Sequence, residues 1–255
     1  MMAKICIIGK KGSASKIEIS RNTSVKLYRG QEADAVVNYG LAGDKLSSFI
    51  KTYPKLNKVP IINKYVGRSK YSSIKNAESK GILVPESKVY LDRLDTLDDW
   101  IEKKINSSQG KGIIKARTGH GISGKYYQKL VKSRKYELRV HAFAWLPIEN
   151  WSVQKRIGPA NQITWNYHTG GHFKNLNNPD KFDVFKKAKE VSEEVLKLHN
   201  MSFGAVDFIV TDDLKVYFIE INSSPGFSNL SGKIYFKAME ELTKLSSKEL
   251  TDLGE

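Results

Sequence analysis

The sequence predicts a mixed α+β fold in which short apolar strands alternate with helices. Three features predict it: a strand–helix–strand pattern over residues 1–62, a long amphipathic helix over residues 179–199 and an apolar hairpin over residues 205–221. The chain has 255 residues, of which 40% are hydrophobic and 27% charged, as is usual for a globular protein with a continuous core. This composition excludes a disordered chain, a collagen and a disulfide-stapled miniprotein.

Cysteine content and hydropathy predict a cytoplasmic protein with no membrane partner. The single cysteine, Cys6, lies in an apolar run and has no second cysteine in the chain to pair with. No apolar run approaches the ~20 residues that a membrane helix needs. Residues 1–11 contain only the short apolar stretch Ile5–Ile8, so we expect no signal peptide.

The net charge of +15 is unevenly distributed. Residues 1–135 hold 28 Lys and Arg against 11 Asp and Glu, whereas residues 136–255 hold 14 against 16. A basic half favours an anionic partner such as a nucleotide, a nucleic acid or an acidic peptide. A charged, solvated surface explains the same excess, and the charge pattern alone does not choose between these alternatives.

Residues 1–62 form the first unit, for which we expect a small α/β domain. Apolar runs predict three short strands, at Lys4–Ile8, Ala33–Val37 and Val59–Ile62. Helical spacing predicts a helix at Ala42–Tyr53. The segment Gly9-Lys-Lys-Gly12 lacks the Gly-Lys-Ser/Thr ending of a phosphate loop, and no strong helix pattern follows it. We therefore expect a plain turn there.

Residues 63–124 form the second unit, in which helices and extended segments alternate. The expected elements are a helix at Ser69–Lys80 that stops at Gly81, an extended segment at Val84–Leu91, a helix at Thr96–Ile105 and a strand at Lys111–Ala116. The helix at Thr96–Ile105 is predicted by an apolar stripe that includes Leu97, Trp100 and Ile101.

Residues 125–255 form the third unit, which is rich in strands. The expected elements are strands at Tyr126–Val131 and Tyr136–Leu146, a helix at Pro179–His199, hairpin strands at Ala205–Val210 and Lys215–Ile221, and a helix at Lys233–Leu245. The helix at Pro179–His199 has the clearest pattern, because its apolar residues recur every three or four positions.

Two acidic residues and an amide lie in the apolar hairpin. Asp207 is on its first strand, and the strand period of two places Glu220 and Asn222 on one face of its second. If the turn closes on Asp213-Leu214, Asp207 lies opposite Glu220 with Cβ atoms roughly 5 Å apart. A slip of two residues leaves the pair diagonal, and a slip of one puts the two acids on opposite faces.

These carboxylates need a positive partner, because burying an unpaired carboxylate is costly. Hard oxygen ligands without a nearby His or Cys suit Mg²⁺. Neutralisation by Lys or Arg is the alternative. We favour the metal ion because no basic residue lies on the same strand face.

A glycine-rich loop follows the predicted strand at Lys111–Ala116. Lys115 near the strand end can place its ammonium group on a phosphate. Gly119, Gly121 and Ser123 allow backbone N–H groups to approach an anion closely. The alternative is a hairpin connection with an exposed lysine.

Two further polar groups suit an anion or substrate site. Glu137 and Arg139 share one strand face, where the guanidinium suits two-point binding of a carboxylate or phosphate, with a surface ion pair as the alternative. His168 and His172 are four residues apart, but neither Cys nor a helix pattern surrounds them, which disfavours zinc. We expect His168 to be a polar contact in a substrate loop.

Taken in order, these motifs resemble those of the ATP-grasp ligases. They are most similar to the branch that includes the ribosomal-protein glutamate ligase and short phage-encoded relatives, over residues 63–245. The matching motifs are Ile-Ile-Lys115-Ala-Arg-Thr-Gly-His-Gly, Tyr-Glu137-Leu-Arg139-Val-His, Asn166-Tyr-His-Thr-Gly-Gly171, Phe-Gly-Ala-Val-Asp207-Phe and Glu220-Ile-Asn222-Ser-Ser-Pro-Gly226. The resemblance implies an N-terminal α/β domain (1–62), a central ATP-grasp subdomain (63–124) and a C-terminal ATP-grasp subdomain with a metal-binding hairpin (125–255).

The resemblance also implies a role for each matching residue. ATP phosphates would be bound by Lys115 and by the loop that contains Arg117, Gly119, Gly121 and Ser123. Adenine would be bound by the backbone of the strap Tyr127–Val131, that is by Gln128, Lys129, Leu130 and Val131. Glu137 would hold the ribose, Arg139 would face an acyl phosphate and Asn166 would help to hold the phosphates. Two Mg²⁺ ions, or Mn²⁺ in their place, would be bound by Asp207, Glu220 and Asn222.

The activity implied by the resemblance is an ADP-forming carboxylate–amine ligase that works through an acyl phosphate. Its substrates would be ATP, a small-molecule or peptide carboxylate, and an amine. A nucleotide-binding protein of the same fold without turnover is one alternative. A ligase that modifies a nucleic acid is another, although no nucleic-acid-binding motif is present and aromatic residues such as Tyr65, Tyr71 and Tyr90 are scattered.

Overall fold

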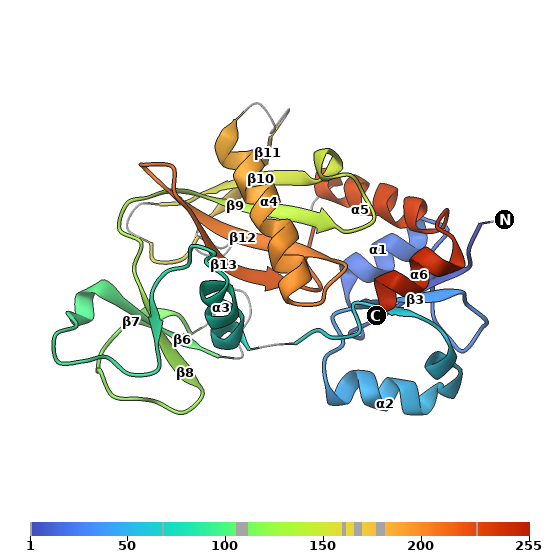
Figure 1. Cartoon of the computed structure of the whole chain (residues 1–255), viewed down its shortest axis with the longest axis horizontal. Helices are drawn as coiled ribbons and strands as arrows, with labels where there is room; N and C mark the ends of the chain where they lie inside the picture. Colours follow the sequence, from blue (N-terminus) through green and yellow to red (C-terminus); the bar gives the residue numbers. More distant parts are fainter. Residues whose placement is uncertain are drawn as a thin grey trace.

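The computed structural model describes residues 2–67, 69–105, 112–159, 162–165, 170–176, 182–227 and 229–255. In this part of the chain, helices flank three β-sheets. A five-stranded sheet lies in the middle of the molecule, with one four-stranded sheet near each end (Figure 1). The mixed α+β character predicted from the sequence is confirmed.

The N-terminal sheet is parallel and has the strand order β2-β1-β3-β4. Its elements are β1 (Ile5–Gly9), α1 (Ala14–Asn22), β2 (Lys26–Leu27), β3 (Ala35–Tyr39), α2 (Asp44–Thr52), the 3₁₀ helix η1 (Pro54–Lys58) and β4 (Ile61–Ile62). The three predicted strands and the helix α2 are present. Residues 10–12 form the predicted turn, whereas helix α1, which begins at Ala14, was not predicted. Its only buried residue is Ile19, which explains why its apolar pattern is weak.

The central sheet is antiparallel and has the order β5-β8-β6-β7. Its elements are α3 (Lys70–Ser79), β5 (Ser87–Lys88), the 3₁₀ helix η2 (Leu97–Asp99), β6 (Trp100–Lys104), β7 (Ile114–Lys115) and β8 (Lys125–Lys129). The helix predicted at Ser69–Lys80 is present as α3, and Gly81 follows its end with a φ of 76°, as predicted. Ser69 caps its start by accepting a hydrogen bond from Ser72 N.

The helix predicted at Thr96–Ile105 is wrong. Only η2 is helical, and the chain then runs on as strand β6, which pairs with β8 and β7. Apolar residues at positions 97, 100, 101 and 105 fit a helical stripe, but Trp100 and Ile101 also favour a strand. Pairing on both edges satisfies the backbone of β6 and decides in favour of the strand.

The five-stranded sheet has the order β11-β10-β9-β12-β13, with antiparallel neighbours throughout. Its elements are β9 (Arg134–Phe143), the 3₁₀ helix η3 (Ile148–Asn150), β10 (Ser152–Ile157), β11 (His172–Asn175), α4 (Asp183–Leu198), β12 (Phe203–Thr211) and β13 (Val216–Asn222). Helix α4 crosses one face of this sheet (Figure 1) and buries the predicted apolar stripe, which includes Ala188, Val191 and Val195. It begins at Asp183, and the predicted start at Pro179 lies outside the described residues.

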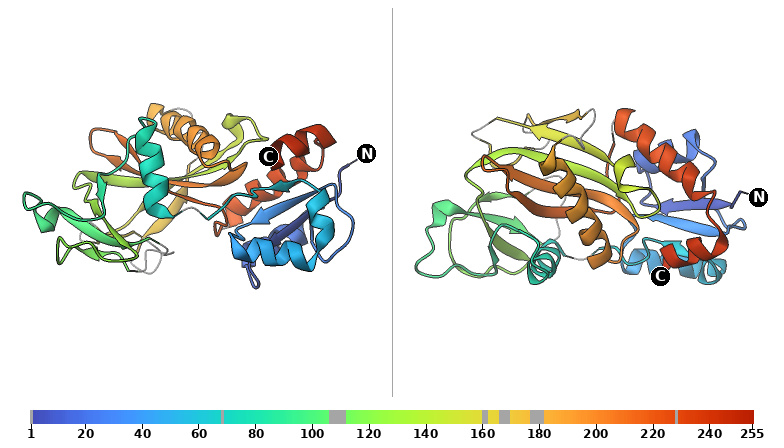
Figure 2. Two further views of the ribbon diagram at one scale, coloured as in Figure 1. Left: turned by 60° about the horizontal axis from the view of Figure 1, so that its bottom comes forward. Right: turned by 45° about the horizontal axis from the view of Figure 1, so that its top comes forward.

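The C-terminal helices return to the N-terminal sheet. They are α5 (Asn229–Leu242), which packs against α1, and α6 (Ser247–Gly254), which packs against β4 (Figure 2). Helix α6 was not predicted, although Ser246 and Glu249 form a capping box that marks its start. The ring of Tyr39 at the end of β3 stacks on that of Phe203 in β12, with centroids 5.9 Å apart. One apolar core therefore joins the N-terminal sheet to the five-stranded sheet. No described helix has the length and apolar character to span a membrane.

Strand pairing bears on the division into units at residues 62 and 124. Strand β8 falls in the predicted third unit, yet it pairs with β5 and β6 of the second. A boundary between Lys129 and Arg134 therefore agrees better with the sheets than one at residue 124. The three-domain division itself stays a prediction.

Gly40 lies where the N-terminal sheet meets the segment after β13, and we predict that alanine is poorly tolerated there. Its φ is 86°, and an added Cβ would lie 2.5 Å from Cβ of Ser224. Gly40→Ala should lower the free energy of unfolding by about 2–4 kcal/mol in urea titrations, because strain and a clash add. The control Gly81→Ala shares a positive φ but meets open space, and should lose about 1 kcal/mol. Equal losses would contradict the close approach.

Candidate active site

A cavity of about 530 Å³ lies where the three sheets meet. It is lined by the loop between β1 and α1, by the first residue of α3, by β6 and β8, by β9, β12 and β13, and by residues 224–226. A second cavity of about 460 Å³ adjoins it and is lined by residues 128–132. The two share Ile101, Gln128 and Arg134, so they form one continuous recess of the size that holds a small-molecule ligand.

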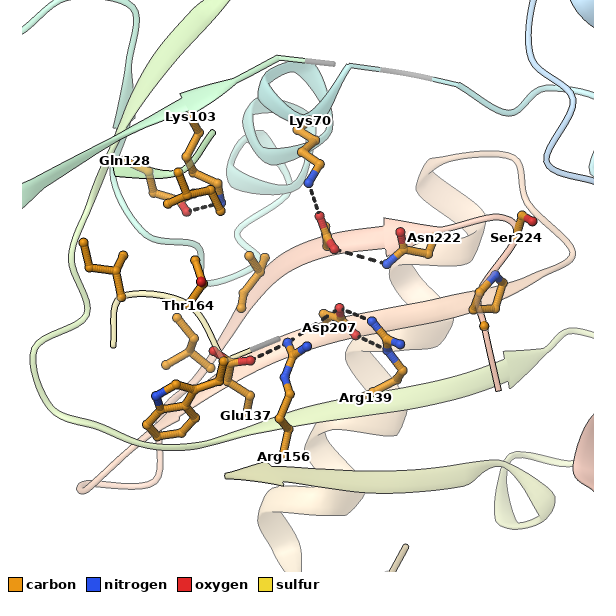
Figure 3. Close-up of a pocket in the computed structure, with 18 of the residues that line it drawn as sticks. Lys70, Lys103, Gln128, Glu137, Arg139, Arg156, Thr164, Asp207, Asn222 and Ser224 are labelled. Atoms are coloured by element: carbon orange, nitrogen blue, oxygen red, sulfur yellow. Dashed lines mark hydrogen bonds and ion pairs between the residues drawn. The ribbon is translucent and has the colours of Figure 1, made fainter. Parts of the chain in front are cut away.

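The hairpin strands pair in the register that places the two acids together. Asp207 lies directly opposite Glu220, and Ala205 lies opposite Asn222. A β-bulge follows Asp207, between residues 207 and 208. The directly opposed arrangement is therefore confirmed over the two slipped ones. All three polar side chains line the cavity, as the period of two requires (Figure 3).

Arg139 neutralises Asp207 from the neighbouring strand. It lies opposite Asp207 in the β9–β12 register, and its Nε and Nη2 atoms each donate to a carboxylate oxygen at 2.7 Å (Figure 3). Asp207 is 2% exposed, so this two-point pair is shielded from water. Burial alone would lower the pKa of Arg139, but the adjacent carboxylate raises it above its usual value, and the guanidinium stays charged.

Lys70 neutralises Glu220 from the first turn of α3. Its Nζ lies 2.6 Å from Oε2 of Glu220, while Nδ2 of Asn222 donates to Oε1 at 3.3 Å (Figure 3). Burial favours the neutral acid, but the charge and hydrogen bond of Lys70 outweigh it and lower the pKa of Glu220 to about 2. Glu220 is therefore a carboxylate at neutral pH.

These contacts bear on the predicted metal site. Basic residues reach the acids from β9 and α3 rather than from the hairpin strands, so the lack of a basic residue on the same strand face does not favour a metal ion over Lys or Arg. The described residues contain no cluster of three or more His, Cys, Asp or Glu that could bind a metal ion. Two carboxylates and an amide oxygen nevertheless form a hard donor set that fits Mg²⁺. To bind the ion, an oxygen of Glu220 would have to be released by Lys70, or an oxygen of Asp207 by Arg139. The metal assignment stays a prediction.

Glu137 lies between two guanidinium groups. Its Oε1 pairs with Nη1 of Arg134 at 3.1 Å, and its Oε2 pairs with Nη2 of Arg156. The side chain is 4% exposed, and Arg156 lies over the ring of Phe173 in β11 at 4.9 Å. Both carboxylate oxygens of Glu137 are thus paired with arginines. The predicted contact of Glu137 with ribose stays a prediction.

Lys103 is a buried residue of the cavity wall that the sequence analysis missed. It is 5% exposed, lines the cavity from β6, and donates from Nζ to Oε1 of Gln128 at 2.9 Å (Figure 3). Burial lowers its pKa to about 8, and Glu220 partly offsets this effect. The available signal was a lysine two residues after apolar Ile101, a spacing that places both side chains on one face of a strand. The prediction of a helix in this segment concealed it.

The predicted phosphate loop lies apart from the lining of the cavity. Lys115 is opposite Ile101 on the edge strand β7, and its side chain is exposed. Gly119 and Gly121 pack against residues 89–91. The described residues that line either cavity include none of Lys115, Arg117, Gly119, Gly121 and Ser123. Asn166 and His168 lie outside the described residues, whereas Thr164 beside them lines the larger cavity.

The predicted adenine strap does line a cavity. Gln128, Lys129, Leu130 and Val131 all border the smaller cavity. The backbone N–H groups of Lys129 and Leu130 donate to carbonyls of Glu86 and Asp99, which ties the strap to its own sheet. Its role in binding adenine stays a prediction.

Solved structures share this fold, although the sequence matches no protein-family model and no curated protein. A D-alanine–D-alanine ligase from Bacillus anthracis complexed with ATP aligns with a TM-score of 0.65 at 14% identity over 99% of both chains. The ATP-grasp ligase PsnB, complexed with a precursor variant, Mg and ADP, aligns at 0.61 and 11% identity over 94% of this chain and 98% of that one. A RiPP-associated ATP-grasp ligase from Chryseobacterium gregarium, in complex with ADP and a leader and core peptide, aligns with a TM-score of 0.57 at 14% identity over 99% of this chain and 96% of that one.

The chain therefore has the ATP-grasp fold, as its motifs predicted. At 11–14% identity these alignments establish the fold and leave the reaction open. The finer resemblance to the ribosomal-protein glutamate ligase branch and to phage proteins stays a prediction.

The low pKa of Glu220 predicts a pH-dependent contribution to stability. A carboxylate with a folded pKa of about 2, against its usual 4.5, stabilises the fold above about pH 4.5 and loses this effect as the pH falls toward 2. Without metal or nucleotide, the difference in unfolding free energy between wild type and Glu220→Gln should shrink by on the order of 2 kcal/mol across that range. Glu193→Gln, on the exposed face of α4, should show a far smaller change. A wild-type advantage that stays constant with pH would mean that Glu220 titrates normally.

Proposed function

We propose that the protein is an ATP-dependent, ADP-forming carboxylate–amine ligase that works through an acyl phosphate. The observation that carries this proposal is the pair of opposed carboxylates, Asp207 and Glu220, surrounded in one cavity by Lys70, Lys103 and Arg139. A cavity that gathers carboxylates and basic side chains in this way suits a polyanionic substrate whose negative charge must be balanced during phosphoryl transfer. The shared fold supports the proposal, because the aligned structures are ligases with ATP or ADP bound.

In this proposal the nucleotide extends along the continuous recess. Adenine would occupy the smaller cavity beside the strap Gln128–Val131. The phosphates would extend into the larger cavity toward Lys103 and Lys70. Both ammonium groups are held on regular elements, β6 and the start of α3, so little ordering is needed when an anion binds.

Asp207, Glu220 and Asn222 would hold Mg²⁺, or alternatively Mn²⁺, which would supply positive charge against the triphosphate. We propose two ions. Lys70, which pairs with Glu220 at 2.6 Å, would move to a phosphate oxygen when the metal ions engage that carboxylate. Such an exchange keeps each charge paired throughout binding, which avoids an uncompensated buried charge.

The reaction converts a carboxylate oxygen, which is a poor leaving group, into a phosphate, which leaves readily. A carboxylate oxygen of the acid substrate attacks the γ-phosphorus, the bond from that phosphorus to the β–γ bridging oxygen breaks, and ADP leaves. The amine nitrogen then attacks the acyl carbon, the carbon–oxygen bond to phosphate breaks, and the amine loses a proton. No Ser, Cys or His nucleophile is required. The chain contributes positioning and charge neutralisation, with Arg139 facing the acyl phosphate.

The first test of the proposal is the product balance. ADP and phosphate should form in equal amounts only when both an acid and an amine are present, as measured by chromatography and product mass in a screen of amino acids and peptides. Glu220→Gln should lose at least ~100-fold in turnover with its fold intact, because the amide keeps the shape but loses the charge. Glu193→Gln is the matched control on α4. AMP and pyrophosphate as products would reject the acyl-phosphate route, and full activity of Glu220→Gln would reject the metal assignment.

A second prediction tests whether Lys103 or Lys115 binds the phosphates. Lys103→Met should weaken ATP binding by about 10- to 100-fold, because it removes a buried charged donor from the cavity. Lys115→Met, at an exposed edge position, should have a much smaller effect. Calorimetric titration with ATP measures both. Because the pKa of Lys103 is about 8, wild-type affinity should also fall as the pH rises above 8, and Lys103→Met should lose this dependence. A larger loss in Lys115→Met would restore Lys115 as the phosphate ligand.

A further inference from the structure

The hydroxyl group of Tyr126 in β8 is buried without a hydrogen-bond partner. The side chain is 0% exposed, and its oxygen bonds no other atom of the described residues. Two more buried side-chain atoms in this part of the chain lack a hydrogen bond, Oε2 of Glu137 and Nε of Arg156, but their groups form an ion pair with each other. Buried polar groups are nearly always bonded, because an unbonded one costs stability. The Tyr126 hydroxyl therefore needs an explanation.

Tyr126 lies on the face of the central sheet that borders the larger cavity. It is directly opposite Lys103 in the β6–β8 pairing and two residues before Gln128 on β8, and such neighbours share one face of a sheet. Both Lys103 and Gln128 line the cavity (Figure 3). Nζ of Lys103 lies over the Tyr126 ring, 5.8 Å from its centroid, and the ring of Tyr71 in α3 packs against it at 5.4 Å. The Tyr126 ring is thus held next to Lys103 and to the start of α3.

The hydroxyl is a proton donor at neutral pH, and the acceptors nearest to it in the site are engaged. Burial raises the pKa of Tyr126, and the negative charge of Glu220 raises it further. Oε1 of Gln128 already accepts from Lys103, and the carboxylate of Glu220 is paired with Lys70. The two neighbouring ammonium groups only donate hydrogen bonds, so they cannot serve as acceptors. The missing acceptor has to come from a molecule that binds in the cavity.

We propose that the Tyr126 hydroxyl donates a hydrogen bond to a phosphate oxygen of the bound nucleotide, together with the ammonium group of Lys103. The anion draws this ammonium group away from Gln128 and supplies the acceptor that the hydroxyl lacks. A phosphate suits the position because its oxygens accept from several donors at once. The contact adds a binding residue to the proposed ligase. Its assignment to a phosphate of ATP rests on that function, whereas the missing acceptor does not.

A ligand contact and a purely structural role predict opposite effects of removing the hydroxyl. If the hydroxyl serves a ligand, it is unbonded in the free protein, so phenylalanine should leave the fold at least as stable and weaken binding. If the hydroxyl serves the fold, it has a protein partner in solution. Phenylalanine should then lower stability and leave binding unchanged.

The test therefore compares Tyr126→Phe with wild type in two measurements. Calorimetric titration with ATP and with inorganic tripolyphosphate, each in the presence of Mg²⁺, should show about 10-fold weaker binding of both anions. Tripolyphosphate lacks the nucleoside, so an equal loss places the contact at the phosphates. Urea unfolding without ligand should give a midpoint equal to or above that of wild type, because the substitution removes an unbonded polar atom.

Tyr235→Phe is the matched control. Tyr235 in α5 is also fully buried, but its hydroxyl forms a hydrogen bond with Nδ1 of His141 at 3.1 Å. It is not among the described residues that line either cavity. This variant should have a lower urea midpoint than wild type and should bind both anions as wild type does.

Four outcomes decide between the inference and the proposed function. Unchanged binding by Tyr126→Phe would overturn the inference and leave the ligase intact. A urea midpoint that falls as far as in Tyr235→Phe would also overturn it, because the hydroxyl would then have a partner in the free protein. Wild type that binds neither anion would overturn both. Tyr126-dependent binding of tripolyphosphate without ADP formation in the screen of acids and amines would support the phosphate contact and reject the ligase.

Discussion

The in-register pairing of β9, β12 and β13 is the constraint on which the site depends. It places Arg139, Asp207 and Glu220 side by side on three adjacent strands, facing one cavity. A slip of one residue in either pair would move a charge to the opposite face, into the apolar layer under α4. Leaving any of these charges unpaired inside the protein costs several kcal/mol, so the register and the charge pairs stabilise one another.

This arrangement also explains how a site for a polyanion can be stable before the polyanion arrives. The cations that would meet phosphates are held by carboxylates of the same cavity, as in the contact of Lys70 with Glu220. Among the described residues, Lys103 forms no ion pair with a carboxylate and donates to Gln128 instead, and burial lowers its pKa to about 8. The site therefore contains one lysine that is paired with a carboxylate and one whose charge is lost as the pH rises above about 8.

The parts of this site that depend on local pattern could be predicted, and the parts that depend on tertiary pairing could not. The hairpin acids follow from a period of two and a short turn, both visible in the sequence around Asp207 and Glu220. Lys103 was missed because apolar spacing in its segment fits a helix as well as a strand, and only pairing with β8 decides. Likewise, the helix start that carries Lys70 was predicted, but its contact with Glu220, 150 residues away, has no local signal.

The N-terminal sheet is part of the site rather than an appendage, because its position is fixed by the same core. Tyr39 packs on Phe203 at the start of β12 and also holds Pro225, while α5 and α6 return to cover α1 and β4. The loop with Lys10 and Lys11 is thus anchored to the strand that carries Asp207. A rigid connection of this kind fixes the position of the loop relative to the hairpin acids, so the loop can contribute to the shape of the cavity without first being ordered.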